Sequence, residues 1–237
     1  VMTTTWIIII CVIVFAVLLC FLLAVANFSY DRFMQKYKEL DKIPIQSGLT
    51  TLQFINQLNY NVFQGNLQIL QISQVAGDAY GNGKLFLSTR TISKNSIASF
   101  TIIAHELGHA KQDMEGNKLK RLKFLRYLGK ALGVLLPLCL LAGVILLFFG
   151  ETYFTYGLVL LGCGGAIFLL ALFNKLFTIS IEKDASSKAI VLLKDYLTDS
   201  ELRIARRFLK DARLTYWADF LQIILGWTGF SKKGKLF

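Results

Sequence analysis

Three long stretches of the chain carry no charged residue: residues 6–26, 131–150 and 155–174. At about 1.5 Å per helical residue, each can cross the roughly 30 Å hydrocarbon core of a bilayer. The pattern therefore predicts three transmembrane helices, the second and third joined by a short break. The first stretch lacks a basic flank and exceeds the apolar part of a signal peptide, so we expect it to stay as an anchor.

A fourth apolar stretch, residues 214–230, is shorter and contains Asp219. It fits either a membrane-embedded helix or an amphipathic helix in the interface. The chain thus divides into an N-terminal anchor (1–27), a polar region (28–130), a transmembrane hairpin (131–174), a second polar helical segment (175–213) and the last helix with a basic tail (214–237).

The first polar region begins with helical patterns. Residues 27–42 are predicted to continue the first helix. Thr50 is placed to cap a short helix whose Leu52, Ile55 and Leu58 share one face.

Two short runs with strand character follow, residues 67–73 and 84–88. The loop between them, residues 77–83, ends in Asn82-Gly83, a strong turn signal. The sequence therefore predicts a short β-hairpin.

Residues 93–113 predict a helix that is capped by Ser93 or Asn95 and ends near Gly116. A basic amphipathic run, residues 118–130, then leads into the second span. The predicted fold class is a mainly α multi-pass membrane protein with a small cytosolic zincin-like α+β region.

The composition supports a membrane protein. Hydrophobic residues make up 54% of the 237 positions and charged residues 17%, whereas about a quarter is usual in soluble domains. The four cysteines all lie in the apolar stretches, which argues against a disulfide or a zinc–thiolate site.

The net charge of +11 is an orientation signal on such a chain. All lysines and arginines lie outside the three spans, and the break between the second and third carries only Glu151. Positive segments stay in the cytosol, so we expect a cell-membrane protein with its N-terminus outside and both basic segments inside. Without a recognition motif, the charge does not indicate nucleic-acid binding.

The predicted helix 93–113 contains an HExxH motif, which uses both histidines of the chain. His105 and His109 are one turn apart, so their imidazoles can bind one metal ion. Glu106 lies beside that face and can take a proton from a metal-bound water. The alternative to a metal site is that two capped or buried helix histidines have this spacing by chance.

A third protein ligand is expected for zinc. Gln112 and Glu115 stand where the extended metzincin pattern has glycine and histidine, and no other histidine exists, so a carboxylate is required. Glu182, about two turns beyond the third span, returns to the same membrane face as His109. Asp184 and Glu115 are the alternatives.

Other polar groups have supporting roles or ordinary structural ones. Asp113 is placed to support the His109 ring or to be a solvated carboxylate near the helix end. Tyr216 or Tyr80 could stabilise the transition state, although an interfacial or packing role is the commoner one for a tyrosine. The strand 84–88 offers an edge for an extended peptide or simply packs on the helix.

The run from residues 95 to 113, together with residues 47–50, 85–88, 182–186 and 214–216, resembles the YugP-type membrane zinc metallopeptidases of bacteria, the neutral zinc metallopeptidase family. The resemblance implies a multi-pass membrane zinc peptidase with one Zn²⁺ per chain, whose third ligand corresponds to Glu182. Lys183, where the family is expected to have an apolar residue, and the short loop 77–83 depart from it.

These observations predict a zinc-dependent endopeptidase that cuts membrane-associated or juxtamembrane protein segments at the cytosolic membrane surface. Its expected partners are the lipid bilayer and peptide substrates, with no nucleic acid. The alternatives are a non-catalytic, zinc-stabilised scaffold or chaperone and a small transporter. A transporter would require an intramembrane acid–base relay, for which Asp219 alone is available.

Overall fold

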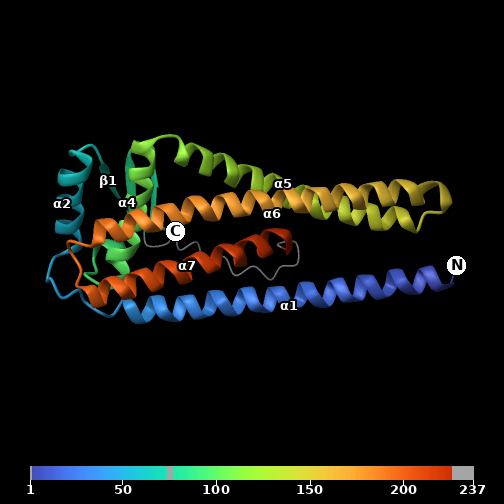
Figure 1. Cartoon of the computed structure of the whole chain (residues 1–237), viewed down its shortest axis with the longest axis horizontal. Helices are drawn as coiled ribbons and strands as arrows, with labels where there is room; N and C mark the ends of the chain where they lie inside the picture. The colour runs from blue at the N-terminus through green and yellow to red at the C-terminus, as the bar shows by residue number, and fades with distance from the viewer. Residues whose placement is uncertain (1, 74–76, 226–237) are drawn as a thin grey trace.

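The computed structural model describes residues 2–73 and 77–225. Long helices lie alongside one another and carry a compact head at one end (Figure 1). The helices are α1 (Met2–Leu40), α2 (Thr51–Phe63), α3 (Thr89–Ile92), α4 (Ile97–Glu115), α5 (Lys118–Leu147), α6 (Glu151–Leu193) and α7 (Asp199–Leu225), and the strands are β1 (Gln68–Ile72), β2 (Ala79–Gly81) and β3 (Lys84–Ser88).

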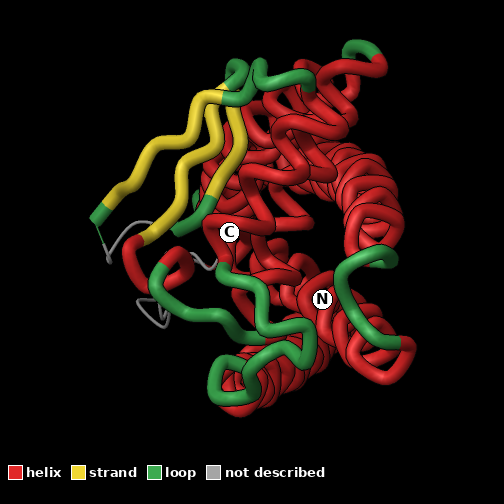
Figure 2. The backbone as a smooth tube through the Cα atoms, turned by 90° about the vertical axis from the view of Figure 1, so that its left-hand side faces the viewer, coloured by secondary structure: helices red, strands yellow, loops and turns green. Residues whose placement is uncertain are grey.

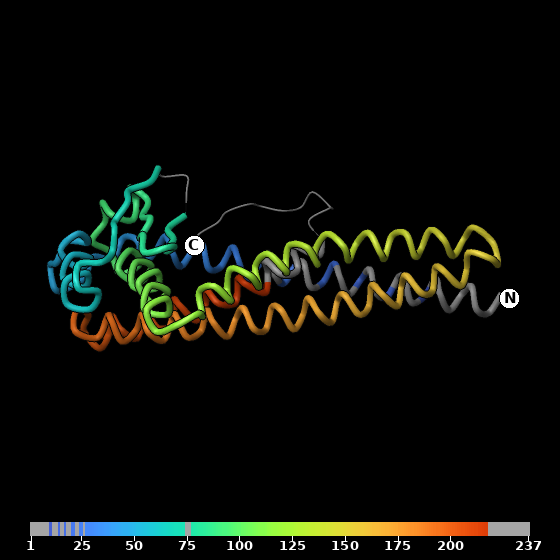
Figure 3. The backbone as a smooth tube through the Cα atoms, turned by 90° about the horizontal axis from the view of Figure 1, so that it is seen from above, coloured from blue at the N-terminus to red at the C-terminus, as the bar shows by residue number. Residues whose placement is uncertain are grey.

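Two helices, α5 and α6, are long and apolar enough to cross a membrane. They run side by side away from the head (Figures 1 and 3). Close contact is possible because Gly157 has no side chain; a Cβ there would lie only 2.8 Å from the carbonyl oxygen of Gly143. The predicted hairpin 131–174 is therefore a packed pair of helices.

Among the described residues, the other two predicted spans are not in helices that meet this length and hydropathy requirement, so they stay predictions; both are parts of longer helices. Residues 6–26 belong to α1, which packs on α7, and residues 214–225 end α7. Residues 226–230 of the fourth prediction and the basic tail lie outside the described residues. The start of α1 and the α5–α6 turn lie at the same end, opposite the head (Figure 1).

The short helix α2 begins where the sequence predicts. The Thr50 hydroxyl accepts from the Gln53 backbone, and the Gln53 side chain accepts from the Thr50 backbone, which closes a capping box. The predicted apolar face is wrong at Leu52, which is 50% exposed; Phe54 lies in the core beside Ile55 instead. The predicted positions Ile55 and Leu58 are buried, and Thr51, Phe54 and Phe63 complete the buried stripe.

The sheet differs from the predicted hairpin. Strand β3 is central, with β1 parallel on one side and β2 antiparallel on the other (Figure 2). The hairpin is formed by β2 and β3 around Asn82 and Gly83, both at positive φ. Strand β2 lies within residues 77–83, which are therefore not all loop. Strand β3 pairs with β1 over residues 84–88 and with β2 over residues 84–86, so residues 84–86 offer no free edge to a peptide.

Helix α4 lies at the centre of the head. Its N-cap is Ser96, whose hydroxyl accepts from the Ser99 backbone, so neither Ser93 nor Asn95 caps it; Asn95 instead accepts from the Thr51 backbone. Residues 97–110 are all buried because α2, the sheet, α6, α7 and α1 surround the helix. Its polar side chains therefore need partners within the protein.

Two cations, one on α3 and one in the segment between α3 and α4, hold a buried carboxylate at the end of α1. Asp41 accepts from Arg90 at 2.7 Å and from Lys94, and its side chain is 3% exposed. Burial would raise the pKa of Asp41, but the hydrogen bonds from Lys94 and Arg90 lower it below its usual value.

We expect Asp41→Asn to destabilise the protein by about 1–3 kcal/mol, because it removes a charged acceptor from two cations. A lowered folded-state pKa contributes stability that is complete above the unfolded pKa of about 4 and is lost as pH falls below it. Thermal unfolding in detergent between pH 3 and 7 should thus show a shallower acid loss for the variant. Equal acid dependence of both proteins would contradict this role.

Candidate metal centre

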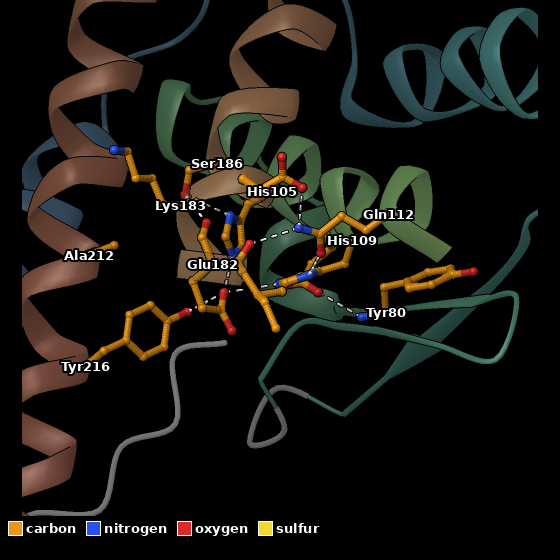
Figure 4. A network of polar contacts seen from close by, with 12 residues as sticks. Tyr80, His105, His109, Gln112, Glu182, Lys183, Ser186, Ala212 and Tyr216 are labelled. Atoms are coloured by element: carbon orange, nitrogen blue, oxygen red, sulfur yellow. Dashed lines mark hydrogen bonds and ion pairs between the residues drawn. The ribbon is translucent and has the colours of Figure 1, made fainter. Parts of the chain in front are cut away.

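Three side chains from two helices converge in the head. His105 and His109 of α4 present Nε2 atoms at 3.3 and 3.2 Å from Oε2 of Glu182 on α6 (Figure 4). The three side chains are buried, and their ligand-type atoms lie within 4.8 Å of one another. This is the set that the sequence and the resemblance select.

Glycine in the motif allows the two helices to approach this closely. A Cβ on Gly108 would lie 2.3 Å from the backbone oxygen of Ala185, three residues after Glu182. No side chain fits there without moving the backbone. Gly108 therefore sets the separation that brings Glu182 to the histidines.

The outer nitrogens of both imidazoles are also held. The Nδ1 atom of His109 is 2.9 Å from the side-chain oxygen Oε1 of Gln112. The side-chain nitrogen Nε2 of Gln112 donates to the Ile181 backbone oxygen and to Asp184. Ser186 donates its hydroxyl to the Glu182 backbone, so its oxygen can accept from Nδ1 of His105 at 3.4 Å.

The Gln112 side-chain oxygen can only accept, so it favours the His109 tautomer with the proton on Nδ1 and the lone pair of Nε2 toward Glu182; the Ser186 oxygen allows the same tautomer in His105. Two lone pairs facing a carboxylate repel it unless a cation lies between them. Burial alone would lower the pKa of His109, yet the Glu182 carboxylate raises it to about 9. A proton can thus occupy this place, and the donor set of two neutral imidazoles and a carboxylate also fits zinc.

Two further groups hold the Glu182 carboxylate. Arg126 of α5 donates to Oε1 at 2.8 Å, and the Tyr216 hydroxyl of α7 donates to Oε2 at 3.0 Å. Lys175 lies over the Tyr216 ring. Sequence reasoning missed Arg126 because nothing distinguishes it from the other cations of the run 118–130.

Glu106 lies next to the three groups and is buried. Its Oε2 accepts from the backbone N–H of Tyr80 in β2 at 2.8 Å. Burial raises the pKa of this carboxyl, and the imidazoles of His109 and His105 offset the rise only in part.

The remaining predicted residues have different places. Burial, together with the hydrogen bond that the Tyr80 hydroxyl donates to Asp113, raises the pKa of Tyr80 to about 12. Tyr80 contacts Glu106 through its backbone N–H instead. Asp113 therefore pairs with Tyr80, and the contact predicted for it on His109 is made by Gln112. The sequence signal for Gln112 is its position three residues after His109.

The alternative ligands lie elsewhere. Asp184 contacts Lys118 and Gln112, and only Gln112 contacts His109. Glu115 pairs with Lys188. Lys183, where the chain departs from the expected pattern, is exposed and points away from the converging groups (Figure 4).

Long helices that suit a bilayer and a buried HExxH–glutamate cluster are the features of a membrane metallopeptidase. The chain belongs to the family described as "Putative neutral zinc metallopeptidase", whose profile matches residues 6–228. Its similarity to "Putative membrane protease YugP" of Bacillus subtilis (strain 168) is 29% identity over 202 residues, covering 81% of this chain and 83% of that protein. No solved structure matches the chain significantly.

Proposed function

We propose that the protein is a membrane-bound, zinc-dependent endopeptidase that hydrolyses peptide bonds with a zinc-activated water and a glutamate general base. The observation that carries the proposal is the convergence of His105, His109 and Glu182 beside Glu106. In this scheme the first three residues hold one Zn²⁺ per chain. Zinc, when bound, lowers the pKa of its water and polarises a carbonyl.

The residues of the chain supply the proton transfers. The Glu106 carboxylate would accept the proton of the attacking water and pass it to the leaving amine. The backbone N–H of Tyr80 holds one oxygen of Glu106, which fixes its orientation toward the reacting groups. The burial of Glu106 excludes bulk water from the carboxylate, which favours proton transfer within the site.

The Tyr216 hydroxyl is proposed to stabilise the developing oxyanion. It donates to the same Glu182 oxygen that faces both imidazoles, so it lies beside the place where the scissile carbonyl would bind. Arg126, on the other Glu182 oxygen, is proposed to hold that carboxylate in position.

The membrane placement is also a proposal. Residues 6–26, 131–150 and 155–174 would cross the bilayer, with the N-terminus and Glu151 outside and the basic segments in the cytosol. Glu182 is eight residues past the third apolar stretch, or about 12 Å along the helix. The site would therefore face the cytosolic membrane surface and act on juxtamembrane segments of proteins.

Zinc analysis and cleavage tests of the purified protein check this proposal. We expect one zinc per wild-type chain and cleavage of an unfolded substrate, with zinc affinity reduced by more than about 100-fold in His105→Ala and in Glu182→Gln, beyond the loss typical of outer partners. Glu151→Gln, a carboxylate change at the exposed far end of the same helix, should retain zinc. Equal zinc content in the wild type and His105→Ala would overturn the proposal.

The rival function is a zinc-stabilised scaffold or chaperone. It uses the same buried cluster, so zinc binding alone does not separate the two. Bound zinc without cleavage of any unfolded substrate would favour the scaffold.

Tyr216→Phe tests the role of the tyrosine hydroxyl. We expect kcat to fall by about 10²- to 10³-fold while zinc content stays near one per chain, because a transition-state donor is lost and the ring is kept. The matched control is Tyr127→Phe, since Tyr127 is exposed on α5 away from the cluster. A large rise in KM with unchanged kcat would contradict the assignment.

A further inference from the structure

A groove of about 460 Å³ separates α5 and α6 where the two helices leave the head. It is lined by Lys118, Arg121, Phe124 and Leu125 of α5 and by Phe177, Ser180, Ile181 and Asp184 of α6. It lies outside the metal centre, and neither the family nor the relative accounts for it.

Two cations form one half of the groove. Lys118 lies 3.0 Å from Asp184, the acidic group in the lining. Arg121 is exposed, and it forms no ion pair with any residue in the described ranges 2–73 and 77–225. The charge of Arg121 is therefore available to an anion, while Lys118 can share its donors between Asp184 and a ligand.

The other half is aromatic. Phe124 is 66% exposed and Phe177 62% exposed, so two large apolar side chains face outward beside the cations. Exposed apolar rings suit contact with acyl chains, and long basic side chains beside them can place their charges at the headgroup level. A small soluble anion would leave this half of the groove unused.

Under the proposed membrane placement, the groove lies at the level of the lipid headgroups. Phe177 is three residues past the apolar stretch 155–174, or about 5 Å along the helix, and Arg121 is ten residues before the stretch 131–150, or about 15 Å. Long basic side chains reach down toward the interface from such positions. The aromatic half then meets acyl chains and the basic half meets phosphates.

We propose that this groove binds one anionic phospholipid, with its phosphate on Arg121 and Lys118 and its upper acyl chains against Phe124 and Phe177. Guanidinium and ammonium groups recognise phosphate, and basic pockets between membrane helices suit anionic headgroups. Ser180 adds a hydroxyl to the same lining.

The lipid would also secure the metal centre at the membrane surface. Lys118 contacts Asp184, Asp184 accepts from Gln112, and Gln112 contacts Nδ1 of His109. A headgroup on Lys118 is therefore connected to a proposed zinc ligand through three consecutive contacts. This step rests on the proposed function, whereas the lipid binding itself does not require catalysis.

Native mass spectrometry of the full chain in detergent tests the binding, with phosphatidylglycerol and phosphatidylcholine as probes. We expect phosphatidylglycerol to bind more tightly, and Arg121→Gln to weaken its binding about fivefold, the factor typical of one interfacial cation. Lys120→Gln removes the same charge from an exposed neighbour outside the groove and should have little effect. Equal losses in the two variants, or equal binding of the two lipids, would overturn the proposal.

A competition arm separates lipid from free anion. Millimolar inorganic phosphate should leave phosphatidylglycerol bound, because it has nothing to place on Phe124 and Phe177. Displacement by phosphate, together with unchanged lipid binding in Phe124→Ser, would show a soluble-anion site and overturn the proposal. Lipid binding without zinc or cleavage would instead count against the proposed peptidase alone.

Discussion

Glu106→Gln is expected to lower kcat by about 10²- to 10⁴-fold while the protein keeps its zinc, the range that a general base contributes. Glutamine has nearly the shape of glutamate, and its carbonyl oxygen can still accept from the Tyr80 backbone, so the head should fold unchanged. What is lost is a group that accepts a proton. The measurement is kcat on an unfolded protein substrate, with zinc content determined on the same sample.

Glu115→Gln is the matched control for this experiment. Glu115 is on the same helix and pairs with Lys188 away from the converging groups, so its kcat should stay within about twofold of the wild type. Stoichiometric zinc and undiminished cleavage in Glu106→Gln would refute the assigned mechanism. Loss of zinc in that variant would show that Glu106 acts through the structure of the site.

Much of the candidate site follows from local spacing. One helical turn separates His105 from His109, and this relation is a property of any helix, so the sequence alone predicts it. Glu182 required further steps: the absence of other histidines, two apolar stretches that return the chain to the same side, and the family resemblance, because spacing alone left Asp184 and Glu115 open. The structure brings these three groups together, whereas their role as ligands stays a prediction.

The missed features depend on contacts between distant segments. Strand β2 has only three residues, too few for a visible alternation, and its pairing with β3 depends on the turn at Asn82 and Gly83. The place of β1 as a parallel neighbour of β3 cannot be derived from either strand. Arg126 likewise acquires its partner only when α5 and α6 pack together.

The helical pattern was most reliable where one face is buried and another exposed. Helix α2 has such a face, and Ile55 and Leu58 lie on it as predicted, whereas Leu52 is exposed and Phe54 is buried. Helix α4 is buried all round, so hydrophobic spacing says little about which side faces α6. There the small side chain of Gly108 marks the contact, and its meaning appears only when Ala185 is placed against it.

Gly108→Ala should therefore damage both the fold and the metal centre. The new methyl carbon would lie 2.3 Å from the Ala185 oxygen and 3.1 Å from its carbonyl carbon, so backbone has to move. Overpacking of this kind costs about 1–3 kcal/mol, which would lower Tm by several degrees in a chain of this size. The gain in helix propensity from glycine to alanine, about 1 kcal/mol, offsets only part of this cost.

The effect of Gly108→Ala on the metal centre is best measured as zinc affinity. Moving α6 away from α4 carries Glu182 away from His105 and His109, so we expect zinc affinity to fall by at least about 10-fold, as when an outer partner is lost. The control is Gly162→Ala: this glycine is also helical, and nothing lies within 4 Å of its added Cβ. It should unfold at or above the wild-type temperature with full zinc content. If Gly108→Ala behaves like this control, the close approach of α4 and α6 does not position Glu182, and the separation of the two helices must be set by contacts further along them.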